Sequence, residues 1–270
     1  MKIKLILSLL ASFSMANIAN AVDIYRSGFE ANGTIFAPNS ILLGQDGWTT
    51  ASPPFLNPNA AIITNLTARS GSQSVEVQDI NLTHAVLVSP PYDAVGSYRR
   101  PVNHIVTPSR PVIKLEADIK LETNQPLSTP ITNDFFCATI AARLAGETLA
   151  DPSRNLGETG LCSNGTATGA RFDEDPSTNP ASIFKRNIQL NRWHHLEAYF
   201  NFANKTISYT VDDRFIDSTP LTEPDGAIVT AREVLRGAMV VYVRPSGGSK
   251  GNYTARFDNF SMKAQQVGDN

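Results

Sequence analysis

Two adjacent runs of alternating residues, at 193–202 and 205–212, constrain the fold of this chain most strongly. Every second residue in these runs is apolar: Leu196, Ala198, Phe200 and Phe202, then Ile207, Tyr209 and Val211. An apolar period of two predicts a β-strand with one buried face, whereas a helix would scatter the same residues around its circumference. Because only an Ala-Asn-Lys turn separates the two runs, they are predicted to form a β-hairpin.

Short strand-like segments separated by turn-forming residues fill most of the remaining chain. The predicted strands lie at 23–29, 60–67, 74–77, 84–89, 112–121, 135–144, 181–190, 237–244 and 255–262. Many short strands with almost no helical periodicity predict an all-β protein, an antiparallel two-sheet β-sandwich. The length fits a single sandwich domain over residues 22–264, followed by a flexible C-terminal tail over 265–270.

The first 21 residues have the composition of a secretory signal peptide. Lys2 and Lys4 form a basic start, an apolar run follows at 5–13, and Ala-Asn-Ala at 19–21 is a small-residue cleavage site. The apolar run is too short to span a bilayer, although a retained membrane anchor is the alternative interpretation. No later stretch is long and apolar enough for a membrane span. The mature chain is therefore expected to be secreted or periplasmic.

The charge of the mature chain argues against nucleic-acid binding. The full sequence has 23 basic and 25 acidic residues, so removing Lys2 and Lys4 leaves 21 basic and 25 acidic residues and a net charge of −4. A mildly acidic chain with no basic cluster in its sequence is a poor partner for a phosphate backbone.

Two cysteines, Cys137 and Cys162, lie in the exported part of the chain. Export makes a disulfide between them the natural prediction. Such a bond would stabilise the fold by about 3 kcal/mol in the chain-entropy account. A metal site is the alternative, but it would need further Cys or His ligands, and none is adjacent in the sequence.

Three local patterns resemble the concanavalin A-like jelly rolls, the superfamily of lectins, laminin-G domains and glucanases. The patterns are Gly28-Phe29-Glu30 followed by Gly44 to Trp48, Trp193 to Leu196 with Tyr209 to Asp212, and Phe257-Asp258-Asn259-Phe260. They occur in the expected order and the resemblance covers most of the mature chain. It implies a jelly-roll sandwich. It selects no function, because this fold hosts binding proteins, hydrolases and lyases.

The same resemblance implies a structural calcium site at Glu30 and Asp258. In jelly-roll carbohydrate-binding modules, a Glu after the first strand and an Asp on the last strand often share one Ca²⁺. Hard oxygen ligands of this kind suit Ca²⁺, and pairing of the first and last strands would bring the two residues together. The alternative is that Glu30 is solvated and Asp258 is an ordinary strand-edge carboxylate.

The polar side of the hairpin, with His195, Glu197 and Tyr199, holds the catalytic candidates. Residues two apart on a strand share one face, and His and Tyr are acid–base types suited to β-elimination from an acidic polysaccharide. Polysaccharide lyases of this fold use such residues together with a marked arginine strand, which this sequence does not show. The alternative is an ordinary solvated strand face.

Glu116 and Asp118 resemble the carboxylate strand of jelly-roll glucanases. Those enzymes need a second carboxylate where this chain has Lys120, so the pattern is broken and an exposed face is predicted. His194 is interpreted as a hydrogen-bonded core histidine and Trp193 as a core residue. Trp48, in a Gly-rich loop, is a candidate sugar-stacking platform for ligand binding, and a core anchor is the alternative.

These observations favour an exported, non-catalytic, lectin-like protein whose partner is a carbohydrate or glycan. A polysaccharide lyase or glycoside hydrolase acting from a concave sheet is the first alternative. A structural envelope protein is the second.

Overall fold

The computed structural model describes ten stretches of the chain. They are residues 21–50, 61–77, 93–102, 104–123, 135–144, 155–163, 165–170, 182–221, 235–244 and 253–268. Residues 1–20 of the expected signal peptide and the strand expected at 84–89 lie outside them. No helix among the described residues is long and apolar enough to cross a membrane.

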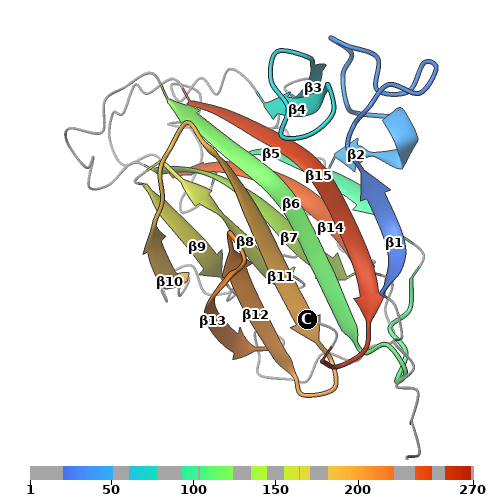
Figure 1. Ribbon diagram of the computed structural model, residues 1–270, viewed down its shortest axis with the longest axis vertical. Coiled ribbons are helices and arrows are strands. Elements are labelled where there is room, and N and C mark those ends of the chain that lie inside the picture. The colour runs from blue at the N-terminus through green and yellow to red at the C-terminus, as the bar shows by residue number, and fades with distance from the viewer. Residues whose placement is uncertain are drawn as a thin grey trace, which may run out of the picture.

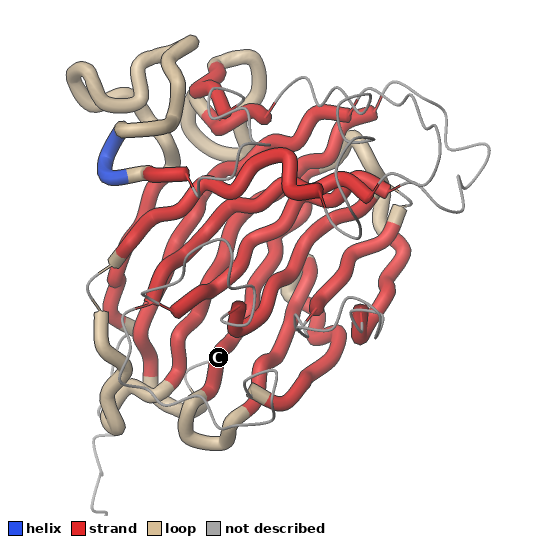
Figure 2. Tube along the Cα trace, turned by 180° about the vertical axis from the view of Figure 1, so that it is seen from behind, coloured by secondary structure: helices blue, strands red, loops and turns tan. Residues whose placement is uncertain are grey.

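The described strands form two antiparallel sheets, as the sequence predicts (Figure 1). The eight-stranded sheet contains, in spatial order, β13 (Arg214–Pro220), β12 (Thr206–Val211), β11 (Trp193–Asn201), β6 (Val112–Thr123), β15 (Tyr253–Gln265), β4 (Ser74–Val77) and β3 (Ala61–Thr64), with β1 (Val22–Ser27) also paired to β15. The seven-stranded sheet contains β10 (Ser182–Asn187), β9 (Thr166–Ala170), β8 (Asn155–Cys162), β7 (Phe135–Leu144), β14 (Leu235–Arg244), β5 (Asp93–Pro101) and β2 (Thr49–Thr50). The reverse view shows the strands of the sandwich and a short 3₁₀ helix, η1 (Gln45–Gly47) (Figure 2).

Alternation along the strands places the core between the two sheets. On β6, Leu115, Ala117 and Ile119 are fully buried members of the hydrophobic core, and Ala138 and Ile140 on β7 join the same core. The residues between them on β6 are charged, so the opposite face of that strand cannot pack into an apolar interior. Each sheet therefore has one apolar inner face and one outer face on which polar groups are placed.

The predicted hairpin is β11 and β12. Leu196 pairs with Val211 and Phe200 pairs with Ile207, and all four side chains are fully buried. At the turn, the Asn201 side-chain oxygen accepts hydrogen bonds from the backbone N–H groups of Ala203 and Asn204. These bonds satisfy donors that the strand ladder leaves open.

The first and last strands pair, also as predicted, with Val22 opposite Ala264 and Ser27 opposite Phe260. The interpretation of Trp48 as a ligand platform is wrong, because its side chain is 0% exposed. Its ring packs edge-on against Phe260, with ring centroids 5.2 Å apart, and its indole N–H donates to the Tyr25 hydroxyl at 3.0 Å. A platform for a surface sugar needs an accessible ring face, which this tryptophan lacks.

The disulfide prediction is confirmed. Cys137 on β7 and Cys162 on β8 lie directly opposite each other and are bonded. At the C-terminus, Gln265 is the last residue of β15, pairs with Val112 and is buried. Any flexible tail therefore begins after Gln265, one residue later than expected.

Candidate functional site

The outer face of the eight-stranded sheet carries a network of charged side chains, here called the charged face. Its members come from β4, β6, β11 and β15, which lie next to one another in the sheet. They are Glu76, Lys114, Glu116, Asp118, Lys120, Glu122, His195, Glu197, Arg256 and Lys263. Strand register brings them together: Asp118 lies opposite His195, and Glu116 lies opposite both Glu197 and Ser261.

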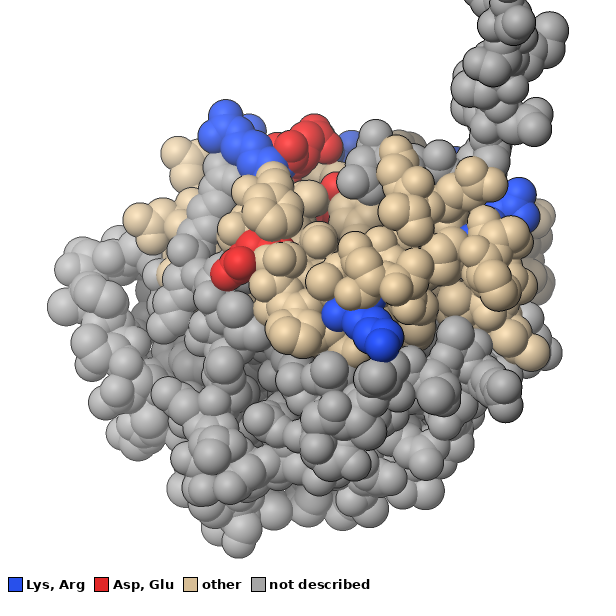
Figure 3. Space-filling view, turned by 90° about the horizontal axis from the view of Figure 1, so that it is seen from below, with Lys and Arg blue, Asp and Glu red and all other residues tan. Residues whose placement is uncertain are grey.

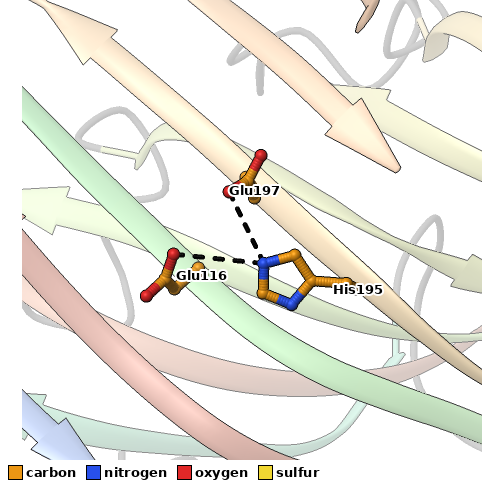
Figure 4. Close-up of side chains that lie close together, drawn as sticks. All are labelled: Glu116, His195 and Glu197. Atoms are coloured by element: carbon orange, nitrogen blue, oxygen red, sulfur yellow. Dashed lines mark ion pairs between the residues drawn. The ribbon is translucent and has the colours of Figure 1, made fainter. Parts of the chain in front are cut away.

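His195 lies at the centre of the charged face (Figure 4). Its Nε2 is 3.5 Å from Glu197 Oε1 and 4.0 Å from Glu116 Oε2. Its Nδ1 is 3.1 Å from Asp118 Oδ1. Two of the three predicted catalytic residues therefore meet here, together with the two carboxylates that the sequence interpretation assigned to a separate exposed face.

That assignment of Glu116 and Asp118 is wrong. The two residues are 8% and 6% exposed. Lys114 Nζ, on the same strand, is 2.5 Å from Glu116 and also pairs with Glu197 on β11, and Lys263 Nζ on β15 is 2.5 Å from Glu116. The sequence gives no sign of the pairs between strands, since they depend on which strands are adjacent.

The surroundings keep both glutamates ionised. Burial alone raises the pKa of Glu116, but hydrogen bonds from Lys114, Lys263 and Ser261 overcome it and lower that pKa to about 2. The pKa of Glu197 is likewise held well below its usual range, because hydrogen bonds from His195 and Lys114 outweigh its burial. Neither carboxyl group is suited to donate a proton at neutral pH.

His195 is correspondingly held in its protonated form. Its hydrogen bonds to Asp118 and then to Glu197 raise its pKa to about 10 against the effect of burial. An imidazolium with this pKa cannot accept a proton at neutral pH, so it does not serve as a general base. Tyr199, the third predicted candidate, is half-buried beside Lys114. Its pKa is raised to about 12, and burial is the main cause.

The rest of the charged face is paired in the same way. Arg256 donates its Nε–H to Glu122 at 2.8 Å and also pairs with Glu76, and Lys120 pairs with Glu122. Asp118 also accepts a hydrogen bond from the Asn259 side-chain amide at 2.7 Å. Every carboxylate of the charged face thus lies against at least one cation.

Glu116, His195 and Glu197 are also the one group of three among the described residues with the ligand types and spacing of a metal site. One ligand atom from each lies within 4.8 Å of the others. Imidazole with carboxylates suits several divalent metals. The Lys114 ammonium already lies between the two glutamates, however, so a metal would have to displace both that ammonium and a proton from His195.

The two residues predicted to share calcium, Glu30 and Asp258, hold the same loop, residues 69–73. Glu30 Oε1 accepts from the backbone N–H groups of Ser72 and Gln73 at 2.8 and 3.1 Å. Asp258 Oδ2 accepts hydrogen bonds from the backbone N–H groups of Arg69 and Ser70, at 2.8 and 3.0 Å. Backbone N–H groups therefore already donate to both carboxylates, while calcium binding itself stays a prediction.

Burial dominates the titration of Asp258. It raises the pKa of this carboxyl group to about 6, against the opposing effect of the backbone N–H groups of Ser70, Asn259 and Arg69. A buried carboxylate with a raised pKa gains from a nearby cation, so the chemistry of this residue fits a calcium ligand.

The sequence interpretation is confirmed for one of the two residues at the start of β11 and is wrong for the other. His194 is a buried, hydrogen-bonded histidine, as interpreted: its ring nitrogens lie 2.8 Å from Asp212 Oδ2 and 2.8 Å from the Gln189 carbonyl oxygen. Trp193 is not a core residue. It lies opposite Lys120, on the same face as His195, and is half-buried.

The end of the molecule shown in Figure 3 carries few described charges. They are scattered among uncharged side chains, and one basic group lies beside an acidic one. The charged face is thus a feature of the sheet rather than of the turns at its end.

Comparison with known proteins gives the fold. No protein-family profile matches the chain, and no curated protein matches it significantly. Among solved structures, an endo-1,3-beta-glucanase from Streptomyces sioyaensis is similar with a TM-score of 0.59 and 9% identity, covering 92% of this chain and 98% of that one. A carbohydrate esterase from the Shiga toxin-encoding bacteriophage phi24B is similar with a TM-score of 0.55 and 12% identity, covering 92% and 100%.

These similarities confirm the resemblance inferred from the sequence: the chain has the concanavalin A-like jelly-roll fold. At such low identity they establish the fold alone. A weaker similarity, with a TM-score of 0.43 and 12% identity over 81% of this chain and 96% of the other, is to the carbohydrate-binding module CBM66 from Bacillus subtilis, and it informs neither fold nor function.

Proposed function

We propose that this chain is an exported protein that recognises a carbohydrate without cleaving it. The observation that carries the proposal is the charge state of the charged face. Its carboxylates and its imidazole have the residue types of an acid–base site, but ion pairs hold Glu116 and Glu197 ionised and His195 protonated. Groups fixed in this way form hydrogen bonds well and transfer protons poorly at neutral pH.

The fold supports a carbohydrate as the ligand. The two solved structures described above, each with a TM-score above 0.5, are of proteins named as acting on carbohydrate, a glucanase and an esterase. The half-buried rings of Trp193 and Tyr199 flank the His195 cluster on the same strand, where aromatic rings suit contact with sugars. The Cys137–Cys162 disulfide supports an oxidising, exported location.

An enzyme is the second candidate, because Glu116 and Glu197 face each other across two strands and both approach His195 Nε2. A retaining glycosidase needs two carboxyl groups about 5–5.5 Å apart, one of them protonated. A lyase of the kind considered above needs a neutral base. The pairing around this cluster opposes both requirements, since it favours ionised carboxylates and a protonated imidazole.

A combined binding and turnover assay tests the proposal. Mature protein is screened against a panel of soluble polysaccharides, and bound polymers are then incubated with it and assayed for new reducing ends, released acetate and unsaturated sugar ends. We expect binding without product. Product formation that disappears in Glu197→Gln would overturn the non-catalytic assignment, and failure to bind any glycan would leave a structural envelope role.

A further inference from the structure

Three side-chain atoms on the charged face converge on one position between β6 and β11. His195 Nε2 lies 3.5 Å from Glu197 Oε1 and 4.0 Å from Glu116 Oε2, and the three atoms all lie within 4.8 Å of one another. Two ligands that each lie about 2.1 Å from a tetrahedral metal ion are about 3.4 Å apart. The shortest of the distances is close to this value, and a modest rotation of the glutamate side chains would bring the other atoms to it.

The imidazole ring is oriented as in metal sites. His195 Nδ1 lies 3.1 Å from Asp118 Oδ1, and because a carboxylate only accepts, Nδ1 is the donor and carries a hydrogen. Nε2 is the nitrogen that faces the two glutamates (Figure 4). A carboxylate behind the ring is the usual partner of a metal-bound histidine, because it fixes the tautomer and the orientation of the ring.

Hydroxyl groups hold the two glutamates from behind in the same way. Ser261 Oγ donates to Glu116 Oε1 at 2.6 Å, and the Thr210 hydroxyl donates to Glu197 Oε2. In each glutamate the other oxygen is the one that approaches His195. Each of the three residues therefore presents one ligand atom to the common position and is fixed by a hydrogen bond on its other side.

A cation already lies at this position. Lys114 Nζ contacts the same two oxygens, Glu116 Oε2 at 2.5 Å and Glu197 Oε1. A metal ion bound there would replace two single positive charges, the Lys114 ammonium and the Nε2 proton of His195, by one divalent charge, so the two carboxylates stay balanced. The ammonium group sits on a flexible stem 5.4 Å from the centre of the Tyr199 ring, which offers it a partner when it is displaced.

We propose that Glu116, His195 and Glu197 bind a divalent transition metal ion, Zn²⁺ or a first-row neighbour, in competition with the ammonium group of Lys114. One imidazole and two carboxylates suit such ions, whereas Ca²⁺ and Mg²⁺ prefer ligands that are all oxygen. The three residues supply three of the four ligands of a tetrahedral ion, and water is the usual fourth. This site is separate from the predicted calcium site and goes beyond the proposed function.

Titration of the metal-free mature chain with Zn²⁺, followed by calorimetry, tests the inference. We expect Zn²⁺ to bind and to resist displacement by about a hundredfold excess of Ca²⁺. His195→Gln should lose at least about a hundredfold in affinity, because the loss of a residue behind a ligand already costs about tenfold to a hundredfold. His104→Gln, which changes a histidine outside the charged face, is the matched control and should bind as the parent does.

Lys114→Met tests the competition, and misfolding cannot imitate its expected result. It removes the ammonium group but keeps a long side chain, so Zn²⁺ no longer has to displace a cation. Its affinity for Zn²⁺ should rise by about tenfold, the worth of one hydrogen bond between charged groups. Zn²⁺ should also raise the melting temperature of Lys114→Met more than that of the parent, because tighter binding to the folded state stabilises it more.

Four outcomes would overturn the inference. Equal affinity in the parent and His195→Gln would place the metal elsewhere on the chain, and ready displacement by Ca²⁺ would indicate a site of oxygen ligands alone. Equal affinity in the parent and Lys114→Met would refute the competition. No binding by the parent, whether or not Lys114→Met binds, would show that the cluster is an ion-pair network only. None of these results bears on the proposed function, because no glycan is present in the titrations.

Discussion

The outer faces of the two sheets are held together in different ways. On the eight-stranded sheet, strand register places anions beside cations, as with Lys114 between Glu116 and Glu197. On the seven-stranded sheet, the described outer positions of β7 and β8 instead hold the Cys137–Cys162 disulfide and the hydrogen-bonded pair Thr139 and Glu158. Ion pairs hold the first face together, whereas a covalent bond and a hydrogen bond hold these positions of the second.

The difference decides how each sheet responds to its surroundings. Ion pairs on the charged face depend on the protonation of their members, so their contribution to stability changes with pH. A disulfide does not titrate and is lost only by reduction or substitution. The predictions below test this comparison, beginning with the largest expected effect.

Phe200→Ala should cause the largest loss of stability, about 3–5 kcal/mol, because it opens a cavity in the core beneath the charged face. Ser208→Ala, on the opposite side of the same hairpin, is the control and should change stability by less than about 0.5 kcal/mol. Chemical denaturation of both variants measures the difference. Equal losses would mean that the inner and outer faces of the eight-stranded sheet are assigned the wrong way round.

Removing the disulfide should cost about 3 kcal/mol, because the bond restricts the unfolded chain. The paired variant Cys137→Ala/Cys162→Ala is compared with the parent by denaturation, and non-reducing mass spectrometry of the parent should find the two cysteine peptides linked. Two free thiols in exported protein would contradict the prediction. This bond ties β7 to β8, so its loss should weaken the seven-stranded sheet first.

Calcium, if bound at Glu30 and Asp258, should stabilise the fold by roughly 2.7 kcal/mol at a hundredfold excess over its dissociation constant. A chelator should then lower the melting temperature and added Ca²⁺ should restore it. Asp258→Ala should abolish the response, whereas Asp213→Ala, in an exposed turn, should keep it. A substitution of Asp118 would not serve as the control, because Asp118 is hydrogen-bonded to Asn259, the residue after Asp258. A melting curve indifferent to chelator and Ca²⁺ would remove the site.

His195 should make stability depend on pH in the alkaline range. Its pKa is raised from 6.5 to about 10 in the folded protein, mainly by the hydrogen bond to Asp118. Its contribution is therefore fully present below about pH 6.5 and is lost as the pH rises through about 10. Melting temperatures measured across this range should decline in the parent, and the decline should be shallower in His195→Gln. An identical decline in both proteins would show that the imidazole is not held by the charged face.

Glu116 makes stability depend on pH in the acid range, in the opposite direction to His195. Its lowered pKa of about 2 contributes stability that is present above about pH 4.5 and is lost as the pH falls through about 2. The acid and alkaline limits thus report two different members of the same face.

Local periodicity was enough to predict the fold. The alternation around Phe200 and Ile207 gave the hairpin and its buried face, and export gave the disulfide between Cys137 and Cys162. Trp48 was misjudged because a Gly-rich loop looks exposed in sequence, whereas this one folds over the end of the sandwich and buries the ring against Phe260.

The site was less predictable, because it depends on strand order. His195, Glu197 and Tyr199 were found together since they share one strand, but Lys114 and Lys263 reach the same cluster from β6 and β15.

The most direct test of the account compares the melting temperatures of Glu116→Gln and Asp213→Asn, each measured without ligand at neutral pH and low salt. Glu116→Gln removes a carboxylate that Lys114 and Lys263 share, and should melt about 4 °C or more below the parent. Asp213→Asn removes the same charge in an exposed turn and should melt at the parent temperature. Equal losses in the two variants would contradict the claim that the ion pairs of the charged face stabilise the protein.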